Sequence, residues 1–157
     1  MKTVTLTPVG GDLDVTTGST LVKGLLARDL KIDMACGGKG LCATCHVYVR
    51  QGGDCLTPRT PREERTLALV VGADPDSRLA CQARVESDGA VVEVPAGLYV
   101  QTTDGFQELV GAKAAYDYLH PITGRLLIPK GKFVTRTVIG EFAAATQELK
   151  KVRDSAV

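Results

Sequence analysis

The stretch Ala35-Cys36-Gly37-Gly38-Lys39-Gly40-Leu41-Cys42-Ala43-Thr44-Cys45-His46 places three cysteines at the spacing C-x5-C-x2-C. A fourth cysteine follows later, in Ser77-Arg78-Leu79-Ala80-Cys81-Gln82. Four thiolates together can hold a 2Fe-2S cluster. The candidate ligands of the cluster and its metal ions are Cys36, Cys42, Cys45 and Cys81.

Glycines separate the first two of these cysteines, at Gly37, Gly38 and Gly40. Glycine adopts left-handed backbone angles without steric cost, so this loop can curl tightly and bring its N–H groups to the sulfurs. A cluster with four thiolates is an anion, and hydrogen bonds to its sulfurs help to set its reduction potential. We therefore expect the loop both to hold the cluster and to tune it.

Other uses of cysteine fit the pattern less well. Structural zinc also takes four cysteines, but commonly from two short knuckles, whereas Cys81 stands alone here and the first interval has five residues. A disulfide is rare in an intracellular chain. Buried cysteines without a ligand would not need neighbouring glycines. These alternatives stay open but rank below the cluster.

The same residues resemble the adrenodoxin-type 2Fe-2S ferredoxins, including the bacterial ferredoxins of iron-sulfur cluster assembly. That family shares C-x5-C-x2-C-H and a later R-L-x-C-Q, matched here from Cys36 to His46 and from Arg78 to Gln82. Plant-type ferredoxins have the different spacing C-x4-C-x2-C. The resemblance covers residues 1–97. It implies that the four cysteines bind a 2Fe-2S cluster in a one-electron carrier.

Composition and charge argue against several classes of function. The chain has 19 Lys and Arg against 18 Asp and Glu, and a net charge of +1 gives no support for binding nucleic acid or a charged membrane surface. No apolar run is long enough to span a membrane, and the N-terminus lacks a secretion signal. There is no phosphate-binding glycine loop and no paired nucleophile and base. We expect a cytoplasmic protein without catalytic residues.

Residues 1–97 show the pattern of an α+β domain. Lys2 to Thr7 alternates apolar with polar side chains, and Leu13 to Thr16 follows a glycine turn, which predicts a hairpin. A helix with apolar positions from Leu21 to Leu30 comes next. Further strands are predicted at Val47 to Arg50, Ala83 to Glu86 and Ala90 to Val94. This order is typical of a β-grasp sheet.

A second helix is predicted from Pro61 to about Val70. Thr60-Pro61-Arg62-Glu63 is a capping box with proline at the first helical position. In adrenodoxin-type ferredoxins the matching helix is an acidic docking face. Here the segment mixes Arg59, Arg62 and Arg65 with Glu63 and Glu64. This departure is compatible with a different reductase and also with an ordinary solvated surface.

Residues 98–157 form a C-terminal extension beyond the resemblance. Apolar spacing from Phe106 to Leu119 predicts a helix, which Gly111 weakens. Apolar segments on both sides of Pro129-Lys130-Gly131-Lys132 predict a β-hairpin. An amphipathic helix is predicted from Arg136 onward, with an apolar stripe that packs on the ferredoxin core or forms a homodimer or partner contact. The stripe consists of Val138, Phe142, Ala145, Leu149 and Val152.

Three further side chains need an interpretation. We expect His46 to form a hydrogen bond near the cluster loop, since four thiolates already suffice as ligands. His120 precedes Pro121 in a predicted turn, which favours a structural role. Cys55, the fifth cysteine, is either an inert small side chain or an alternative ligand or redox-sensitive thiol.

Together these patterns predict an α+β, β-grasp 2Fe-2S ferredoxin fold with an appended C-terminal hairpin and helix. The predicted function is that of a soluble one-electron carrier between a reductase and an acceptor enzyme, with protein redox partners and no bond chemistry of its own. The alternative is a redox-responsive interaction module, in which the cluster state controls a partner or dimer contact through the extension. A third hypothesis is a domain in which the metal is structural and no electrons are transferred.

Overall fold

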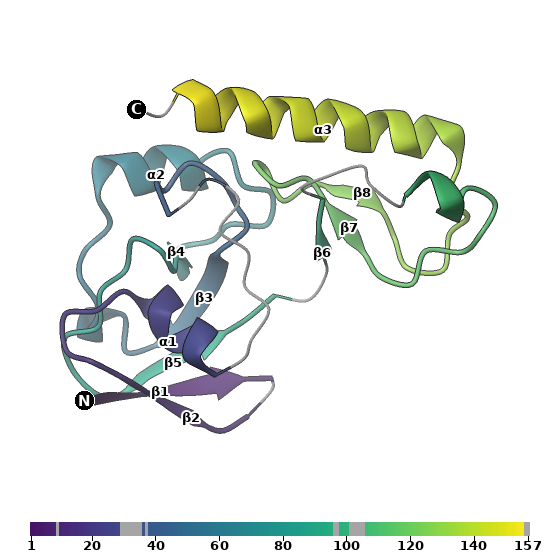
Figure 1. Cartoon of the computed structure of the whole chain (residues 1–157). Helices are drawn as coiled ribbons and strands as arrows, with labels where there is room; N and C mark the ends of the chain where they lie inside the picture. Colours follow the sequence, from purple (N-terminus) through teal and green to yellow (C-terminus); the bar gives the residue numbers. More distant parts are fainter. Residues whose placement is uncertain (9, 29–35, 37, 96–97, 101–105, 156–157) are drawn as a thin grey trace.

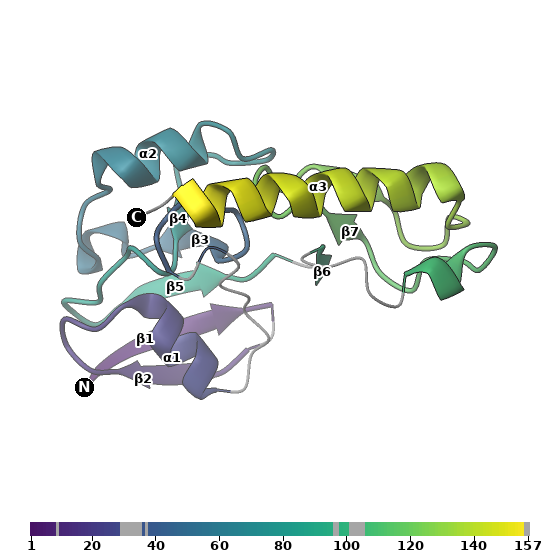
Figure 2. The ribbon, with the colours of Figure 1, turned by 45° about the horizontal axis from the view of Figure 1, so that its top comes forward.

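The computed structural model of the 157-residue chain describes residues 1–8, 10–28, 36, 38–95, 98–100 and 106–155 (Figure 1). Its strands form two separate sheets, one of five strands and one of three. Helix α3 (Arg136–Ser155) runs above the three-stranded sheet and extends towards helix α2 (Pro61–Leu67), as both views show (Figures 1 and 2). None of the described helices is long and apolar enough to cross a membrane.

The larger sheet is mixed, because β1 and β5 run parallel while its other neighbouring strands are antiparallel. Its strands are β1 (Lys2–Thr7), β2 (Asp12–Val15), β3 (His46–Gln51), β4 (Ser77–Leu79) and β5 (Ala90–Glu93), in the order β2-β1-β5-β3-β4. In β1, Val4 and Leu6 are buried while Thr5 between them is exposed, as the period of two in a strand requires. Helix α1 (Leu21–Ala27) packs beside β2, and a short 3-10 helix, η1 (Gly53–Cys55), follows β3. The β-grasp prediction is confirmed.

Two details of this domain differ from the prediction. The strand beside β3 is Ser77–Leu79, whereas the predicted strand at Ala83 to Glu86 makes only isolated bridges. Its hydrogen bonds are divided between two loops: Val85 N–H donates to Ser19 O, and Arg84 O accepts from Thr57 N–H. Each of these bridges involves a single residue pair, so no continuous ladder forms. Helix α2 also ends earlier than predicted, at Leu67.

The extension has its own small sheet and core. Its strands are β6 (Leu98–Tyr99), β7 (Tyr118–Leu119) and β8 (Leu126–Ile128), in the order β6-β7-β8. A second 3-10 helix, η2, spans Gln107–Leu109. The apolar core beneath α3 contains Val100, Ala114, Tyr118, Leu127, Ile128, Val134, Phe142 and Ala145.

The predicted helix from Phe106 to Leu119 is wrong, and so is the predicted hairpin around residues 129–132. After η2, Gly111 has a φ of +91°, which ends any helical path. Residues 111–114 then bond to residues 131–134: Gly111 N–H donates to Val134 O at 2.9 Å and Ala114 N–H to Lys132 O at 2.8 Å. Strand β8 therefore pairs with β7 rather than with Phe133 and Val134.

The predicted amphipathic helix is confirmed as α3. The middle of its stripe is buried within the chain, with Phe142 and Leu149 both 0% exposed, whereas Val138 and Val152 are half-buried. Phe142 packs in the core of the extension, at 4.8 Å between ring centroids from Phe106 and 5.5 Å from Tyr118. Leu149, two turns later, packs instead against Cys36 and Cys42. Contact with Cys36 and Cys42 is thus made near the C-terminal end of the stripe, whereas Val138, Phe142 and Ala145 pack in the core of the extension.

Candidate metal centre

The four candidate thiols meet between the start of β3 and the end of β4. Cys36, Cys42 and Cys45 lie on the loop of residues 36 and 38–45, here called the cysteine loop, and Cys81 lies two residues after the end of β4. All four are buried, with exposures of 2%, 1%, 2% and 7% in chain order. The predicted ligand residues are therefore brought together in one buried place.

The thiols are arranged as two pairs, Cys36 with Cys42 and Cys45 with Cys81. Within each pair the sulfurs are close enough to share a hydrogen bond, which lowers the pKa of Cys36 to about 5 and that of Cys81 to about 7, against the opposing effect of burial. The same two bonds, together with burial, raise the pKa values of Cys42 and Cys45. In each pair, one thiol therefore loses its proton more readily than the other. Metal ions bind thiolates and displace such protons.

Hydrogen-bond donors surround the sulfurs. Leu41 N–H donates to Cys36 Sγ at 3.5 Å, and the Gln82 amide donates to Cys81 Sγ at 3.5 Å. The Thr44 hydroxyl lies 3.1 Å from Cys42 Sγ. Donors of this kind stabilise thiolates and the additional negative charge that reduction brings. Gln82 belongs to the R-L-x-C-Q motif of the sequence. The contact of the Thr44 hydroxyl with Cys42 was not predicted from the sequence.

Gly40 shows why this loop needs glycine. Its φ is +74°, in the left-handed region, and a Cβ at this position would lie 2.9 Å from Gln82 Cδ. The carbonyl of Gly40 accepts a hydrogen bond from the Thr66 hydroxyl on α2 at 2.6 Å. Gly38 also has a positive φ of +80°, and Gly37 lies outside the described residues. Backbone freedom and close packing are therefore both required at Gly40.

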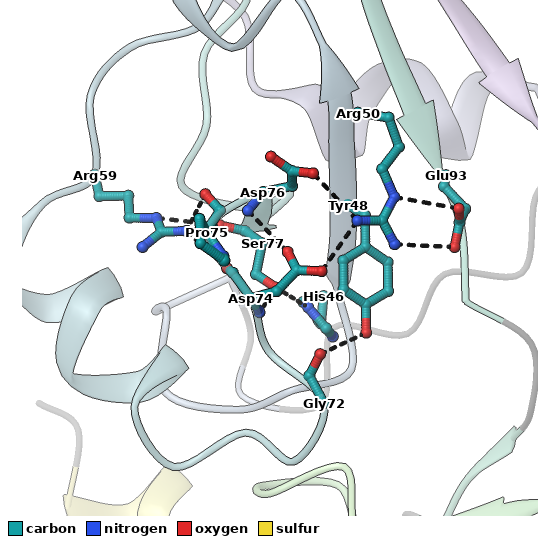
Figure 3. A network of polar contacts seen from close by, with 10 residues as sticks. All are labelled: His46, Tyr48, Arg50, Arg59, Gly72, Asp74, Pro75, Asp76, Ser77 and Glu93. Carbon is teal, nitrogen blue, oxygen red and sulfur yellow. Dashed lines mark hydrogen bonds and ion pairs between the residues drawn. The ribbon is translucent and has the colours of Figure 1, made fainter.

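His46, next to Cys45, is buried and bonded away from the thiols. Its Nε2 lies 2.8 Å from Ser77 Oγ, and its ring meets Tyr48 edge-on at 4.7 Å (Figure 3). Ser77 Oγ also accepts from Asp74 N–H at 2.9 Å. Burial lowers the pKa of His46 to about 4, with the Asp74 carboxylate opposing, so the ring is neutral near pH 7. The expectation that His46 bonds beside the loop is confirmed.

Polar contacts fix β3 to the 74–77 turn that leads into β4 (Figure 3). The Arg50 guanidinium forms ion pairs of 3.0–3.3 Å with three carboxylates, and Arg59 donates to backbone carbonyls of the turn, including Ser77 O at 2.7 Å. The partners of Arg50 are Asp74, Asp76 and Glu93. Each of these exposed pairs contributes little free energy, but together they connect β3 to β5 and to the turn before β4.

A buried ion pair anchors the other flank of Cys81. Glu63 on α2 is 0% exposed and accepts from Arg78 Nε at 2.7 Å, from Arg78 Nη2 at 3.2 Å and from Leu79 N–H at 3.0 Å. The Thr60 hydroxyl caps the helix by accepting from Glu63 N–H, as predicted. The Glu63 side chain does not complete the capping box, because it is directed to β4. This inward role of Glu63 was not predicted from the sequence.

The extension covers part of the cysteine loop. Leu149 packs on Cys36 and Cys42, and Ala43 N–H donates to Pro121 O at 2.8 Å. His120 holds that turn: its Nδ1 accepts from the backbone N–H groups of Ile122 and Thr123, and its Nε2 lies 3.0 Å from Glu148 Oε2 on α3. The predicted structural role of His120 is thereby confirmed.

Cys55 lies away from the two pairs, in η1. It is 8% exposed, packs in the core of the larger sheet, and its thiol donates to Asp88 O at 3.0 Å. These contacts favour the interpretation of Cys55 as an inert small side chain.

Comparison with known proteins places this site in a family. Residues 4–86 match the model of the 2Fe-2S iron-sulfur cluster binding domain. The chain belongs to this family. The 2Fe-2S ferredoxin of Escherichia coli strain K12 is 39% identical over 90 residues, which are 57% of this chain and 81% of the relative. The predicted family, the 2Fe-2S cofactor and the electron-carrier class are confirmed.

Solved ferredoxin structures support the fold of the same region. The ISC-like 2Fe-2S ferredoxin FdxB of Pseudomonas putida aligns with a TM-score of 0.57 and 32% identity, over 60% of this chain and 93% of that one. Putidaredoxin in a covalent complex with putidaredoxin reductase aligns with a TM-score of 0.50 and 34% identity, over 60% of this chain and 97% of its own. These relatives are electron carriers rather than enzymes. Residues 98–155 of this ferredoxin lie outside the family match at residues 4–86.

Proposed function

We propose that Cys36 and Cys42 bind one iron of the 2Fe-2S cluster and that Cys45 and Cys81 bind the other. The arrangement of four buried thiols as two close pairs supports this assignment, because a two-iron cluster offers each iron two protein ligands. Among the described residues no group of three or more His, Cys, Asp or Glu side chains is placed to hold a single metal ion. When bound, the cluster supplies a site that accepts and releases one electron.

Cysteine substitutions test this assignment. Cys42→Ala and Cys81→Ala, one from each pair, should lose the visible absorbance and the content of about two irons and two sulfides per chain. Cys55→Ser is the matched control, since the Cys55 thiol is bonded instead to Asp88 O at 3.0 Å. It should keep the iron content and the paramagnetic signal of the reduced protein. A Cys81→Ala protein with full iron and sulfide would contradict the assignment.

We further propose that the chain carries electrons from a protein reductase to an acceptor enzyme in the cytoplasm. The structural neighbour in complex with its reductase supports a protein partner of this kind. All five cysteines are free, as thiols are in a reducing compartment. Potentiometric titration should give one reversible one-electron couple. A protein that keeps its cluster but cannot be reoxidised reversibly would contradict the carrier.

The redox-responsive interaction module remains a second candidate, and one contact favours it. Leu149 on α3 packs directly against Cys36 and Cys42, two of the proposed ligands. A change of charge at the cluster would therefore occur next to α3 and could change how firmly the helix packs. Amide hydrogen exchange of α3 in the oxidised and reduced states measures the coupling. Equal protection in both states would exclude this module.

We also propose that residues 1–97 and 98–157 are two domains, each with its own core. The homodimer through α3 remains a prediction. The apolar stripe no longer supports this dimer, because Phe142 and Leu149 are already fully buried within one chain. Sedimentation of the cluster-bearing protein decides between monomer and dimer.

A further inference from the structure

A cleft lies where α2, the cysteine loop, the 120–124 turn and the end of α3 meet. Its cavity volume is about 390 Å³, large enough to receive side chains of another protein. The four apolar lining side chains come from the cysteine loop, the segment just after α2, the 120–124 turn and α3, and that of Leu69, after α2, is 63% exposed. The lining residues are Leu41, Arg62, Arg65, Thr66, Leu69, Ile122 and Val152.

The wall formed by α2 is positively charged. Arg62 and Arg65 are both exposed, and neither forms an ion pair with an acidic side chain among the described residues. Within the described part of the chain, Arg62 donates one long bond, of 3.3 Å, to the carbonyl of Lys39. Of the two acids on the helix, Glu63 is directed inward to Arg78, and Glu64 is not one of the described lining residues. Among the described residues, therefore, no acidic side chain pairs with the charge that faces the cleft.

The floor of the cleft touches the proposed cluster site. Leu41 is the chain neighbour of Cys42, and its N–H donates to Cys36 Sγ at 3.5 Å. Two other approaches to the cysteine loop are covered, one by Leu149 and one by the bond from Ala43 N–H to Pro121 O. Because electron transfer weakens with distance, a partner seated in the cleft would be well placed to exchange an electron.

We infer that this cleft is the docking and electron-exchange site for a redox protein with an acidic surface that presents carboxylates beside an apolar side chain. The carboxylates pair with Arg62 and Arg65, and the apolar side chain enters the cleft over Leu41. Complementary charges steer such encounters and fix their orientation. The inference rests on the proposed function and specifies its partner.

Two probe proteins of opposite charge test this inference: ferric cytochrome b5, which is acidic, and ferric cytochrome c, which is basic. Stopped-flow rates of their reduction by the full-length, reduced ferredoxin are measured at low ionic strength. Arg65→Glu should slow cytochrome b5 reduction about tenfold and speed that of cytochrome c, because steering depends on the local charge. Arg62→Glu should act in the same direction.

Arg136→Glu is the matched control, with the same change of charge at the exposed start of α3. It should change either rate less than about twofold, and added salt should remove the difference between Arg65→Glu and the wild type. Equal rates for Arg65→Glu and Arg136→Glu with both cytochromes would overturn the inference. A wild-type protein without a reversible one-electron couple would instead overturn the proposed function.

Discussion

At Gly40, both the backbone angle and the packing require glycine. In Gly40→Ala, a side chain in the left-handed region costs about 1 to 3 kcal/mol. The new methyl group would also displace Gln82, whose amide donates to Cys81 Sγ and to Gly38 O. We therefore expect faster loss of the cluster and a shifted reduction potential. Visible absorbance against time and potentiometric titration measure the two effects.

Gly10→Ala is the control for backbone strain alone. Gly10 has a similar φ of +82°, but a Cβ there would meet no atom within 4 Å. It should lower the free energy of unfolding without changing the potential. If both variants shift the potential equally, the contact with Gln82 is not the cause.

Glu63 tests how the strand before Cys81 is positioned. Glu63→Gln keeps the shape of the side chain but leaves the Arg78 guanidinium, only 9% exposed, without its counter-charge. Breaking a buried ion pair in this way costs about 3 to 5 kcal/mol. Thermal unfolding should show a clear drop in melting temperature, whereas the exposed Glu64→Gln should change it little. Equal melting of both variants would contradict an anchoring role for Glu63.

Among the elements, those with a repeated pattern could be predicted from sequence. The alternation in β1 and the stripe of α3 each involve several residues that obey one period, so their burial follows directly. The cysteine spacing likewise identifies the loop and its fourth partner. Short elements carry too few residues for a period: β4 has three and β7 has two. Their pairing is decided by long-range contacts, such as Glu63 with Arg78 and Gly111 with Val134.

The turn held by His120 predicts a pH dependence. Nδ1 accepts two backbone N–H bonds, so Nε2 carries the proton that faces Glu148. Burial lowers the pKa of His120 below its ordinary 6.5, with the Glu148 carboxylate opposing. The unfolded chain therefore binds more protons than the folded chain as the pH falls through this range. Stability from His120 is complete above pH 6.5 and is lost as the pH falls towards the folded pKa.

Thermal melting between about pH 7.5 and about pH 5.5 measures this dependence. The melting temperature should fall with pH, and His120→Asn should reduce the fall while lowering stability at neutral pH. His46, whose pKa is also lowered, contributes the same sign in both proteins, so the difference between them reports His120. The same fall in both proteins would show that His120 does not contribute to it.

In the whole molecule, the extension is joined to the site that the ferredoxin domain forms. It contacts the cysteine loop through Leu149 and through the 120–124 turn, while its own core around Phe142 supports α3. The sequence predicted the apolar stripe of this helix but not the residues against which it packs. Apolar spacing shows which face of a helix is buried and carries no information about the surface that covers it. In the structure, Phe142 and Ala145 pack in the core of the extension, and Leu149 packs against the cysteine loop.

Truncation after Gly97 tests what this contact does for the cluster. The four proposed ligands and all five strands of the larger sheet precede that point, so the shortened protein should keep the cluster spectrum. Its Cys36 and Cys42 would lose the cover of Leu149, and burial of such a side chain contributes about 1.5 to 3 kcal/mol. We expect the cluster to decay severalfold faster in aerated buffer and the melting temperature to fall.

Two substitutions in the full-length chain separate the causes of that decay. Leu149→Ser should reproduce the fast decay while the core of the extension stays folded, because Leu149 packs with Cys36, Cys42 and Leu41 and is not part of that core. Phe142→Asp should unfold that core, since it places a charge at a fully buried position, and should match the truncation. Sedimentation of all three should report monomers if the stripe serves the chain itself. Decay at the wild-type rate in every variant would show that the extension does not protect the cluster.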